Sequence, residues 1–303
     1  MSKVGSITRI RVRTNAKVNL FLRVLGRLPD GFHEIESIFH TATLGDDIDI
    51  EQLADADRIE VSMDFDGIVG EAPETEQNLA YVAAQRLRER MGDERGWRIA
   101  IRKRIPVGAG LGGGSGNAAG VLVALNELLD AGIDRQTLDA IARDIGSDVP
   151  YCLLGGTALV TGRGENLTAL PSPDSLHLVL AMSDEPLLTR DVYAKWDELD
   201  APGSSASAPM GMALASGDAS EIAAFLHNDL EAAAFALRPE LRDGKELLVE
   251  AGALGAAMTG SGPTLFGIAE SEEHANEIAA RVEGHFARVV PVSSAVACVE
   301  RLD

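Results

Sequence analysis

The segment with the clearest chemical potential is a run of glycines near the middle of the chain, residues 106–116 (PVGAGLGGGSG). Six of these eleven residues are glycine, and so many glycines cost conformational entropy on folding. A pattern typical of an amphipathic helix follows at residues 118–129. Glycines allow the backbone to approach a ligand closely, and the free N–H groups at a helix start attract anions. The run is therefore predicted to bind phosphate, with a purely structural turn as the alternative.

Several better-known phosphate loops do not fit this run. Gly108, Gly110 and Gly113 match the spacing of the dinucleotide-binding fingerprint. That fingerprint needs an acidic residue about 20 positions on, at the end of the next strand, whereas Glu127 and Asp130 fall within or at the end of the same predicted helix. The chain also has no GxxxxGK[S/T] motif, and neither the HRD nor the DFG motif of protein kinases. The glycine run is therefore predicted to be a phosphate-binding loop of another kind.

Two ionisable residues and a second glycine turn stand out by their context. Lys17 lies in residues 15–20, opposite the apolar face of that segment, and an ordinary solvated lysine is the alternative. The chain uses lysine sparingly, with five lysines against 22 arginines. Asp148 follows a predicted helix, where capping or a turn would also explain a carboxylate. Residues 259–264 (TGSGPT) form a glycine turn before a predicted strand, and a hairpin would explain them equally well.

The elements that must position these residues follow from apolar periodicity. Alternating apolar residues predict strands at 18–24, 48–50, 59–63, 97–101, 157–161, 176–181, 264–269 and as a pair over 287–299, with a turn at Asp30 and Gly31. Helical spacing predicts helices at 79–91, 118–129, 138–145, 218–235, 240–252 and 272–284. Residues 200–209 are small and polar and predict a surface loop. Strands and helices interleave irregularly, which favours an α+β fold.

Length and charge restrict the class of protein. The 303 residues suggest about two domains. The net charge of −20 argues against nucleic-acid or anionic-membrane partners, although small anionic ligands respond to the local field. Cys152 and Cys298 are the only cysteines, so neither a disulfide framework nor a structural zinc site is expected. Without a signal-peptide pattern or an apolar run of about 18 residues, a soluble cytoplasmic protein is expected.

Three segments, taken in order, resemble the motifs of the GHMP kinases, a superfamily of small-molecule kinases. They are Lys17-x-Asn19, the loop from Pro106 to Ser115, and Gly260-Ser-Gly262. Residues 27–34 (RLPDGFHE), 146–151 and 155–165 are similar to one branch, which phosphorylates 4-diphosphocytidyl-2-C-methyl-D-erythritol in the non-mevalonate isoprenoid pathway. The likeness runs from about residue 10 to about residue 270, and the Asp-Gly-Phe-His segment separates this branch from its cousins.

The resemblance implies a two-lobed α+β fold. Residues 1–160 would form an N-terminal lobe similar to ribosomal protein S5 and carry the ATP loop, and residues 161–303 would form a C-terminal lobe that contributes to the substrate site. It implies ATP and Mg²⁺ as cofactors, with metal ligands that the sequence does not assign, and a monomer or homodimer. The alternatives are another GHMP kinase, of mevalonate or homoserine type, and an S5-like nucleic-acid-binding protein. The predicted site for a nucleobase argues against the mevalonate or homoserine kinases, and the net charge of −20 argues against a nucleic-acid-binding protein.

The resemblance also implies roles for individual residues. Asp148 would be the general base for the substrate hydroxyl, and Lys17 would polarise that hydroxyl. Phe32 and Tyr193 would stack on the two faces of the cytosine, and His33 would hydrogen-bond to it. The remaining substrate contacts would be Asn19, Thr189, Gly260, Ser261 and Gly262. The ATP site would consist of Leu79, Lys103, Pro106, Val107, Gly108, Ala109, Gly110, Leu111, Gly112, Gly113, Gly114, Ser115 and Gly116.

Two positions depart from the family's usual residues. Phe32 stands where tyrosine is common, which keeps a stacking face and loses a hydroxyl. Gly116 stands where a second serine is common, so Ser115 would be the remaining loop hydroxyl for phosphate or magnesium.

Overall fold

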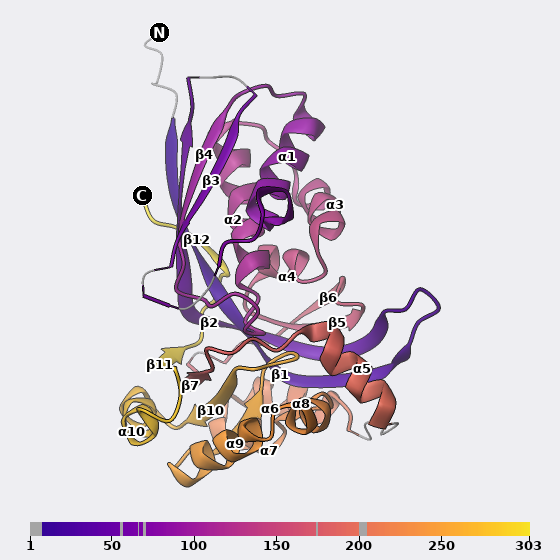
Figure 1. Cartoon of the computed structure of the whole chain (residues 1–303), viewed down its shortest axis with the longest axis vertical. Coiled ribbons are helices and arrows are strands. Elements are labelled where there is room, and N and C mark those ends of the chain that lie inside the picture. Colours follow the sequence, from indigo (N-terminus) through magenta and orange to yellow (C-terminus); the bar gives the residue numbers. More distant parts are fainter. Residues whose placement is uncertain (1–7, 55–56, 66, 69–70, 174, 200–204) are drawn as a thin grey trace.

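Two long antiparallel strands organise the molecule. The computed structural model describes residues 8–54, 57–65, 67–68, 71–173, 175–199 and 205–303. In it, β1 (Arg9–Arg27) and β2 (His33–Gln52) run from one lobe into the other (Figure 1). The predicted turn at Asp30 and Gly31 joins them, and Gly31 has a φ of 91° that favours glycine. Residues on these two strands can therefore face both lobes.

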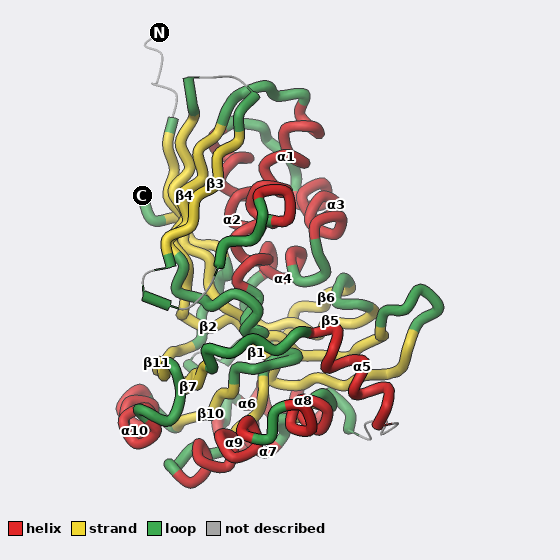
Figure 2. The backbone as a smooth tube through the Cα atoms, viewed as in Figure 1, coloured by secondary structure: helices red, strands yellow, loops and turns green. Residues whose placement is uncertain are grey.

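The upper lobe in Figure 1 is a sheet with helices on one face. Its strand order is β12-β1-β2-β4-β3, while β5 pairs with β2, β6 with β5, and β8 with β1. The added strands are β3 (Ile59–Asp64), β4 (Trp97–Arg102), β5 (Thr157–Gly162), β6 (Asn166–Leu170), β8 (His227–Asn228) and β12 (Val299–Arg301). The covering helices are α1 (Leu79–Met91), α2 (Gly113–Leu128), α3 (Arg135–Ile145) and α4 (Val149–Leu154), with a 3₁₀ turn at Thr75–Gln77 before α1 (Figure 2).

The opposite face of this sheet carries ion pairs. Alternate residues at the start of β1 are exposed, as the strand period requires. Arg13 contacts Asp47 at 2.8 Å, and Arg98 contacts Glu51 at 3.3 Å and Glu60 at 3.2 Å on the neighbouring strands. Because these arginines face carboxylates, the surface has mixed charge and does not form the basic stripe that favours nucleic acid.

The lower lobe is a second antiparallel sheet with helices around it (Figure 1). Its strand order is β11 (Arg288–Ser293), β7 (His177–Met182), β10 (Leu265–Ala269) and β9 (Gly255–Met258). Its helices are α5 (Thr189–Leu199), α6 (Ala208–Ser216), α7 (Ala219–Ala224), α8 (Glu231–Leu237), α9 (Glu240–Glu250) and α10 (Glu272–Val282). One buried cluster joins Val18 and Leu20 of β1 to Leu178 and Leu180 of β7, so the lobes share a core.

The last residues of the chain return to the upper lobe. β12 pairs with β1, and the Asn15 backbone N–H donates to the Cys298 carbonyl at 2.7 Å. Cys298 and Cys152 are both buried free cysteines. The predicted boundary at residue 160 falls inside β5, and the next strand, β6, still belongs to the first sheet. No helix in the described ranges is long and apolar enough to cross a membrane.

Three predicted elements differ in the structure. The single helix predicted over 218–235 is two helices, α7 and α8, because residues 227–228 instead pair with β1 and Asn228 donates to the Met258 carbonyl at 2.7 Å. The helix predicted from residue 118 begins at Gly113, so it includes the end of the glycine run. Of the predicted loop 200–209, residues 200–204 lie outside the described residues, and α6 begins at Ala208.

Candidate active site

A cavity of about 900 Å³ is lined by residues from both lobes. The upper part of the chain contributes β1, β2, the glycine-rich loop and the start of α4, and the lower part contributes α5 and the turn after β9. The predicted site residues in its lining are Lys17, Asn19, Phe32, His33, Gly110, Gly112, Asp148, Thr189, Tyr193, Gly260 and Ser261. Segments far apart in the sequence therefore meet at one cavity.

The glycine-rich loop packs against the second glycine turn and against β1 at close range. A Cβ on Gly110 would lie 2.4 Å from the Thr259 carbonyl oxygen, and Gly110 has a φ of 77°. A Cβ on Gly112 would lie 2.9 Å from Cγ of Lys17. Side chains at these two positions would push the loop away from the lysine and from the turn. Glycine is therefore required here for contact between the three motifs.

Hydrogen bonds fix the same junction. The Asn19 backbone N–H donates to Oγ1 of Thr259 at 3.0 Å, and this hydroxyl lies 3.1 Å from Oδ1 of Asn19. Asn228 donates from Nδ2 to the Gly260 carbonyl at 2.8 Å, and Ser261 and Thr189 share a hydroxyl contact of 2.8 Å. Thr259 is the first residue of the predicted turn at 259–264, whereas Asn228 belongs to no motif, since a single polar residue carries no signal of such long-range contacts.

Lys17 and Asp148 form a charged pair in the lining of this cavity. Lys17 is buried, with 5% of its surface exposed, and its Nζ donates to Oδ1 of Asn19 at 2.7 Å. Nζ lies 3.9 Å from Oδ2 of Asp148 and 4.6 Å from the centroid of the Phe39 ring. Burial lowers the pKa of Lys17, while the Asp148 carboxylate acts in the opposite direction. The alternative of a solvated lysine is therefore wrong.

The surroundings of Asp148 argue against a capping role for its side chain. It precedes α4 as the N-cap residue, yet its side chain makes no capping hydrogen bond to that helix. The carboxylate is directed instead toward Lys17 and the cavity that it lines. A partly exposed carboxylate beside a buried ammonium group is placed to accept a proton from a bound hydroxyl.

Aromatic residues occupy another part of the lining. His33 stacks on Tyr193 with ring centroids 4.6 Å apart, and its Nε2 lies 2.7 Å from Oδ1 of Asp197. Phe32 is 56% exposed, with the Arg163 guanidinium 5.0 Å from its ring centroid. These rings could stack on a planar base. Arg163 and Asp197 also line the cavity, and the motifs did not predict a role for either residue. The signal for Asp197 is its spacing, since it lies four residues after Tyr193 and so on the same helix face.

The residues predicted to bind ATP lie along and beside the glycine-rich loop. Only Gly110 and Gly112 among them line the cavity described above. Val107 is exposed, Ala109 and Leu111 are buried, and a Cβ on Gly114 would lie 3.7 Å from Cδ1 of Leu79. The loop leads into the N-terminus of α2, whose first turn includes Ser115. Free N–H groups at this helix start favour a phosphate.

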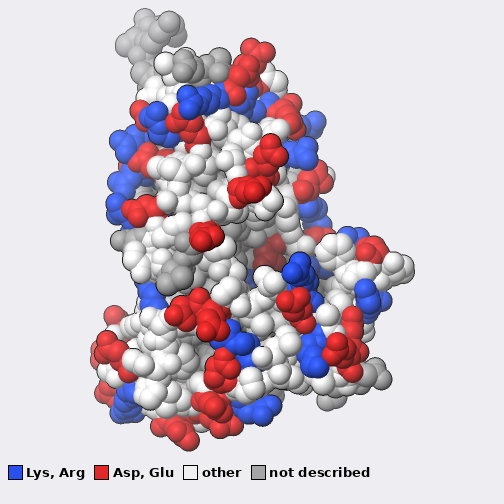
Figure 3. Space-filling view, viewed as in Figure 1, with Lys and Arg blue, Asp and Glu red and all other residues white. Residues whose placement is uncertain are grey.

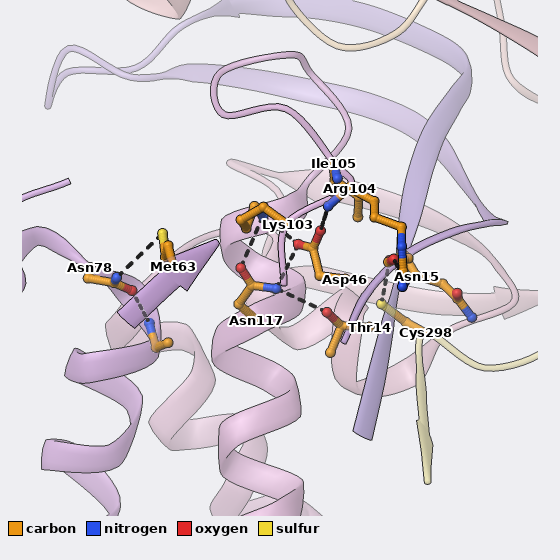
Figure 4. A network of polar contacts seen from close by, with 12 residues as sticks. Thr14, Asn15, Asp46, Met63, Asn78, Lys103, Arg104, Ile105, Asn117 and Cys298 are labelled. Atoms are coloured by element: carbon orange, nitrogen blue, oxygen red, sulfur yellow. Dashed lines mark hydrogen bonds and ion pairs between the residues drawn. The ribbon is translucent and has the colours of Figure 1, made fainter. Parts of the chain in front are cut away.

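Lys103 does not have the environment expected for a nucleotide-binding cation. Its side chain is buried and donates to the Asp46 carboxylate and to Oδ1 of Asn117, the latter at 3.1 Å (Figure 4). Asp46 also accepts the backbone N–H groups of Arg104 and Ile105 at 2.7 and 2.9 Å. The ammonium charge is therefore neutralised beneath the loop. Asp46 thus holds the residues just before the loop, and Lys103 contacts Asn117 just after it. Because Asp46 is distant from Lys103 in the sequence, no local pattern reveals this ion pair.

Charges around the cavity are mixed. Its lining includes the cations Lys17, Arg27, Arg163 and Arg190, and the carboxylates Asp148 and Asp197. On the face drawn in Figure 3, acidic and basic side chains are likewise interspersed. Because the Asp46 carboxylate offsets the charge of Lys103, a positive local field for a phosphorylated ligand depends on backbone N–H groups and on these arginines.

The family of the chain follows from this fold and from matches to family models. The model of the GHMP kinases N terminal domain matches residues 78–156, and the model of the GHMP kinases C terminal domain matches residues 212–288. The chain belongs to the GHMP kinases, as its motifs predict, and the two-lobed α+β fold is confirmed. As a member of this family it is an ATP-using kinase.

The most similar relatives point to one branch. The chain is 42% identical to the 4-diphosphocytidyl-2-C-methyl-D-erythritol kinase of Nocardia farcinica, over 91% of this chain and 90% of the relative. It is 40% identical to the kinase of the same name from Mycolicibacterium smegmatis, over 96% and 94%. A crystal structure of 4-(cytidine 5'-diphospho)-2C-methyl-D-erythritol kinase has a TM-score of 0.78 and 35% identity, covering 94% of this chain and all of that one. A homoserine kinase from Cytophaga hutchinsonii has a TM-score of 0.77 at 23% identity, which shows the fold alone.

Proposed function

We propose that the chain transfers the γ-phosphoryl group of ATP to the 2-hydroxyl of 4-diphosphocytidyl-2-C-methyl-D-erythritol, giving the 2-phosphate and ADP. This reaction belongs to the non-mevalonate route to isoprenoid precursors. The observation that carries the proposal is the position of Lys17 and Asp148, which face one cavity together with a phosphate loop and a cluster of aromatic rings. The names of the relatives, at about 40% identity over most of the chain, support the same reaction.

Each part of the reaction has a candidate group. The hydroxyl oxygen attacks the γ-phosphorus, a new O–P bond forms, and the bond to the bridging oxygen breaks as ADP leaves. Asp148 accepts the hydroxyl proton, which makes the oxygen a better nucleophile. Lys17 stabilises the developing negative charge on that oxygen and holds the carboxylate in place. The loop N–H groups and the start of α2 receive the phosphates of ATP.

Magnesium is part of the proposal. Among the residues that the structure describes, no group of three or more His, Cys, Asp or Glu could hold a metal ion. Mg²⁺ keeps several waters and binds chiefly through substrate phosphates and one or two protein oxygens, so it does not require such a group. The Ser115 hydroxyl, in the first turn of α2, is the candidate protein oxygen. The ion would neutralise charge on the β- and γ-phosphates.

The aromatic cluster favours the cytidyl substrate over those of other GHMP kinases. Phe32, His33 and Tyr193 present ring faces and a polar imidazole to the cavity. A cytosine can use these groups for stacking and a hydrogen bond, whereas mevalonate and homoserine have no ring to stack. We propose Asn19, Thr189 and the turn at 260–262 as contacts to the methylerythritol part.

The division of the chain into two lobes at residue 160 stays a prediction. So does its oligomeric state, which is expected to be a monomer or a homodimer.

An ADP-release assay with three substrates in parallel tests the proposal. The purified chain receives ATP and Mg²⁺ with the cytidyl substrate, mevalonate or homoserine. We expect turnover with the cytidyl substrate and at most weak turnover with the others. Turnover of mevalonate or homoserine alone would contradict the proposed function and leave the family assignment intact.

A further inference from the structure

Arg163 lies on a turn whose backbone is held in one conformation. The turn joins β5 to β6, and it is bounded by Gly162 with a φ of 75° and Gly164 with a φ of 124°. The Arg163 backbone N–H donates to Oε2 of Glu165 at 2.6 Å. Both glycines adopt conformations that other residues rarely tolerate, so the direction in which the arginine leaves the turn is defined.

This turn lies between the two parts of the proposed site. On one side, the Arg163 guanidinium lies 5.0 Å from the centroid of the Phe32 ring. On the other side, a Cβ on Gly164 would lie 3.8 Å from Oδ1 of Asp148 and 3.1 Å from Cβ of Ser147. One residue of the turn therefore faces the ring proposed to bind cytosine, and the next borders the proposed general base.

The proposed substrate has a diphosphate between its two ends. Its cytidine is linked through two anionic phosphates to the methylerythritol that receives the phosphoryl group. When the base lies at Phe32 and the hydroxyl lies at Asp148, the diphosphate lies between them, in the space that this turn borders. A cation on this turn would lie beside the phosphates.

The other cations of the lining are less suited to this task. Lys17 is bound to Asn19 and paired with Asp148. Arg27 lies 3.6 Å from Asp197, which also contacts His33 and is itself part of the lining, so a carboxylate offsets the charge of Arg27 inside the cavity. The Arg190 side chain is 82% exposed and lies beside the carboxylate of its own neighbour.

An ion pair holds the Arg163 guanidinium and leaves N–H groups that can bind a ligand. Its Nη2 contacts Oδ2 of Asp30 at 2.5 Å, and Asp30 is outside the cavity lining. A guanidinium has five N–H donors in a planar fork, more than one carboxylate oxygen can use, and this fork matches phosphate geometry. Contact with the Phe32 ring fixes the guanidinium further. Resting on the proposed function, we propose that Arg163 binds the diphosphate of the cytidyl substrate.

Calorimetry with cytidine, CMP and CDP tests this directly. Saturating ADP occupies the ATP site, so the probes report on the substrate site. The unmodified protein should bind CDP more tightly than cytidine. Arg163→Gln should weaken CDP binding by about tenfold or more and leave cytidine binding within about twofold, because only the charge-assisted contacts to phosphate are lost. Arg163→Lys should recover part of the loss, since lysine keeps the charge without the fork.

Arg98→Gln is the matched control. Arg98 is an ion-paired arginine of similar exposure, 50% against 46% for the Arg163 side chain, on the far sheet face. It should leave all three affinities unchanged. An equal loss for cytidine and CDP in Arg163→Gln would mean that Arg163 only supports Phe32, and would overturn the inference. Unchanged CDP binding would also overturn it. Failure of the unmodified protein to bind either cytidine or CDP would contradict the proposed function itself.

Discussion

The ammonium group of Lys17 lies over the ring of Phe39, with 4.6 Å between Nζ and the ring centroid. Phe39 is a buried residue of β2, and the Asp148 carboxylate is 3.9 Å from the same ammonium group. A buried cation loses its hydration, and an aromatic face replaces part of it at a gain of about 2 kcal/mol in desolvated sites. The ring therefore helps to keep Lys17 charged in a position where burial opposes the charge.

Phe39→Leu should change the pH dependence of turnover. Burial already lowers the pKa of Lys17, with Asp148 and Cys152 acting in the opposite direction. Loss of the ring should lower this pKa further. Because the charged lysine is the active form, activity should be lost on the alkaline side at a lower pH, by about one pH unit. Phe266→Leu removes a similarly buried ring from β10 and should leave the profile in place. An unchanged alkaline limb in Phe39→Leu would contradict the role of the ring.

Asp148→Asn should reduce turnover at least about a hundredfold, because asparagine cannot accept the hydroxyl proton. Binding of ADP, measured by calorimetry, should be retained, since the loop N–H groups and α2 are unchanged. Asp144→Asn, which removes an exposed carboxylate four residues earlier, is the control and should keep full turnover. Normal turnover in Asp148→Asn would remove this residue from the role of base.

Lys103→Met should destabilise the protein by about 3 kcal/mol, because it leaves the buried Asp46 carboxylate without its cation. Urea denaturation measures this free energy of unfolding. The double variant Asp46→Asn/Lys103→Met should recover part of the loss, since no buried charge then remains. Lys195→Met breaks an exposed pair with Glu198 and should have little effect. A raised KM for ATP with unchanged stability would instead place the Lys103 ammonium at the nucleotide.

Phe32→Ala and Tyr193→Ala should each raise the KM for the cytidyl substrate with a smaller effect on the KM for ATP. Stacking on a base contributes about 1–3 kcal/mol, which corresponds to roughly a five- to hundredfold change. Phe225→Ala, which removes a comparably exposed ring at the end of α7, is the control. A normal KM in both variants would refute stacking by these rings.

The sequence predicted those parts of the fold and site that depend on local backbone chemistry. The turn at Asp30 and Gly31 and the glycine-rich loop require conformations that few residues other than glycine adopt, so their composition reveals them. Lys17 and Asp148 are ambiguous separately, and their predicted roles depend on the order of three motifs rather than on their individual patterns. The structure adds their shared cavity and their 3.9 Å separation.

The remaining features depend on partners that are distant in the sequence. The break between α7 and α8 arises because residues 227–228 pair with β1, and no local pattern predicts that pairing. The resemblance implies a place at the nucleotide for Lys103, and no local pattern reveals its buried partner, Asp46, which is 57 residues away. The significance of Arg163 is likewise hidden in the sequence, since it comes from Phe32 on one side and Asp148 on the other.

The pairing of β12 with β1 has a consequence for the order of folding events. The strand that carries Lys17 and its outer neighbour, Val299–Arg301, lie far apart in the sequence. Backbone groups of β1 just before the lysine, including the Asn15 N–H, find their partners in that distant segment. Closing so long a loop costs conformational entropy, so this edge of the sheet is expected to assemble late in folding, after the local elements of each lobe.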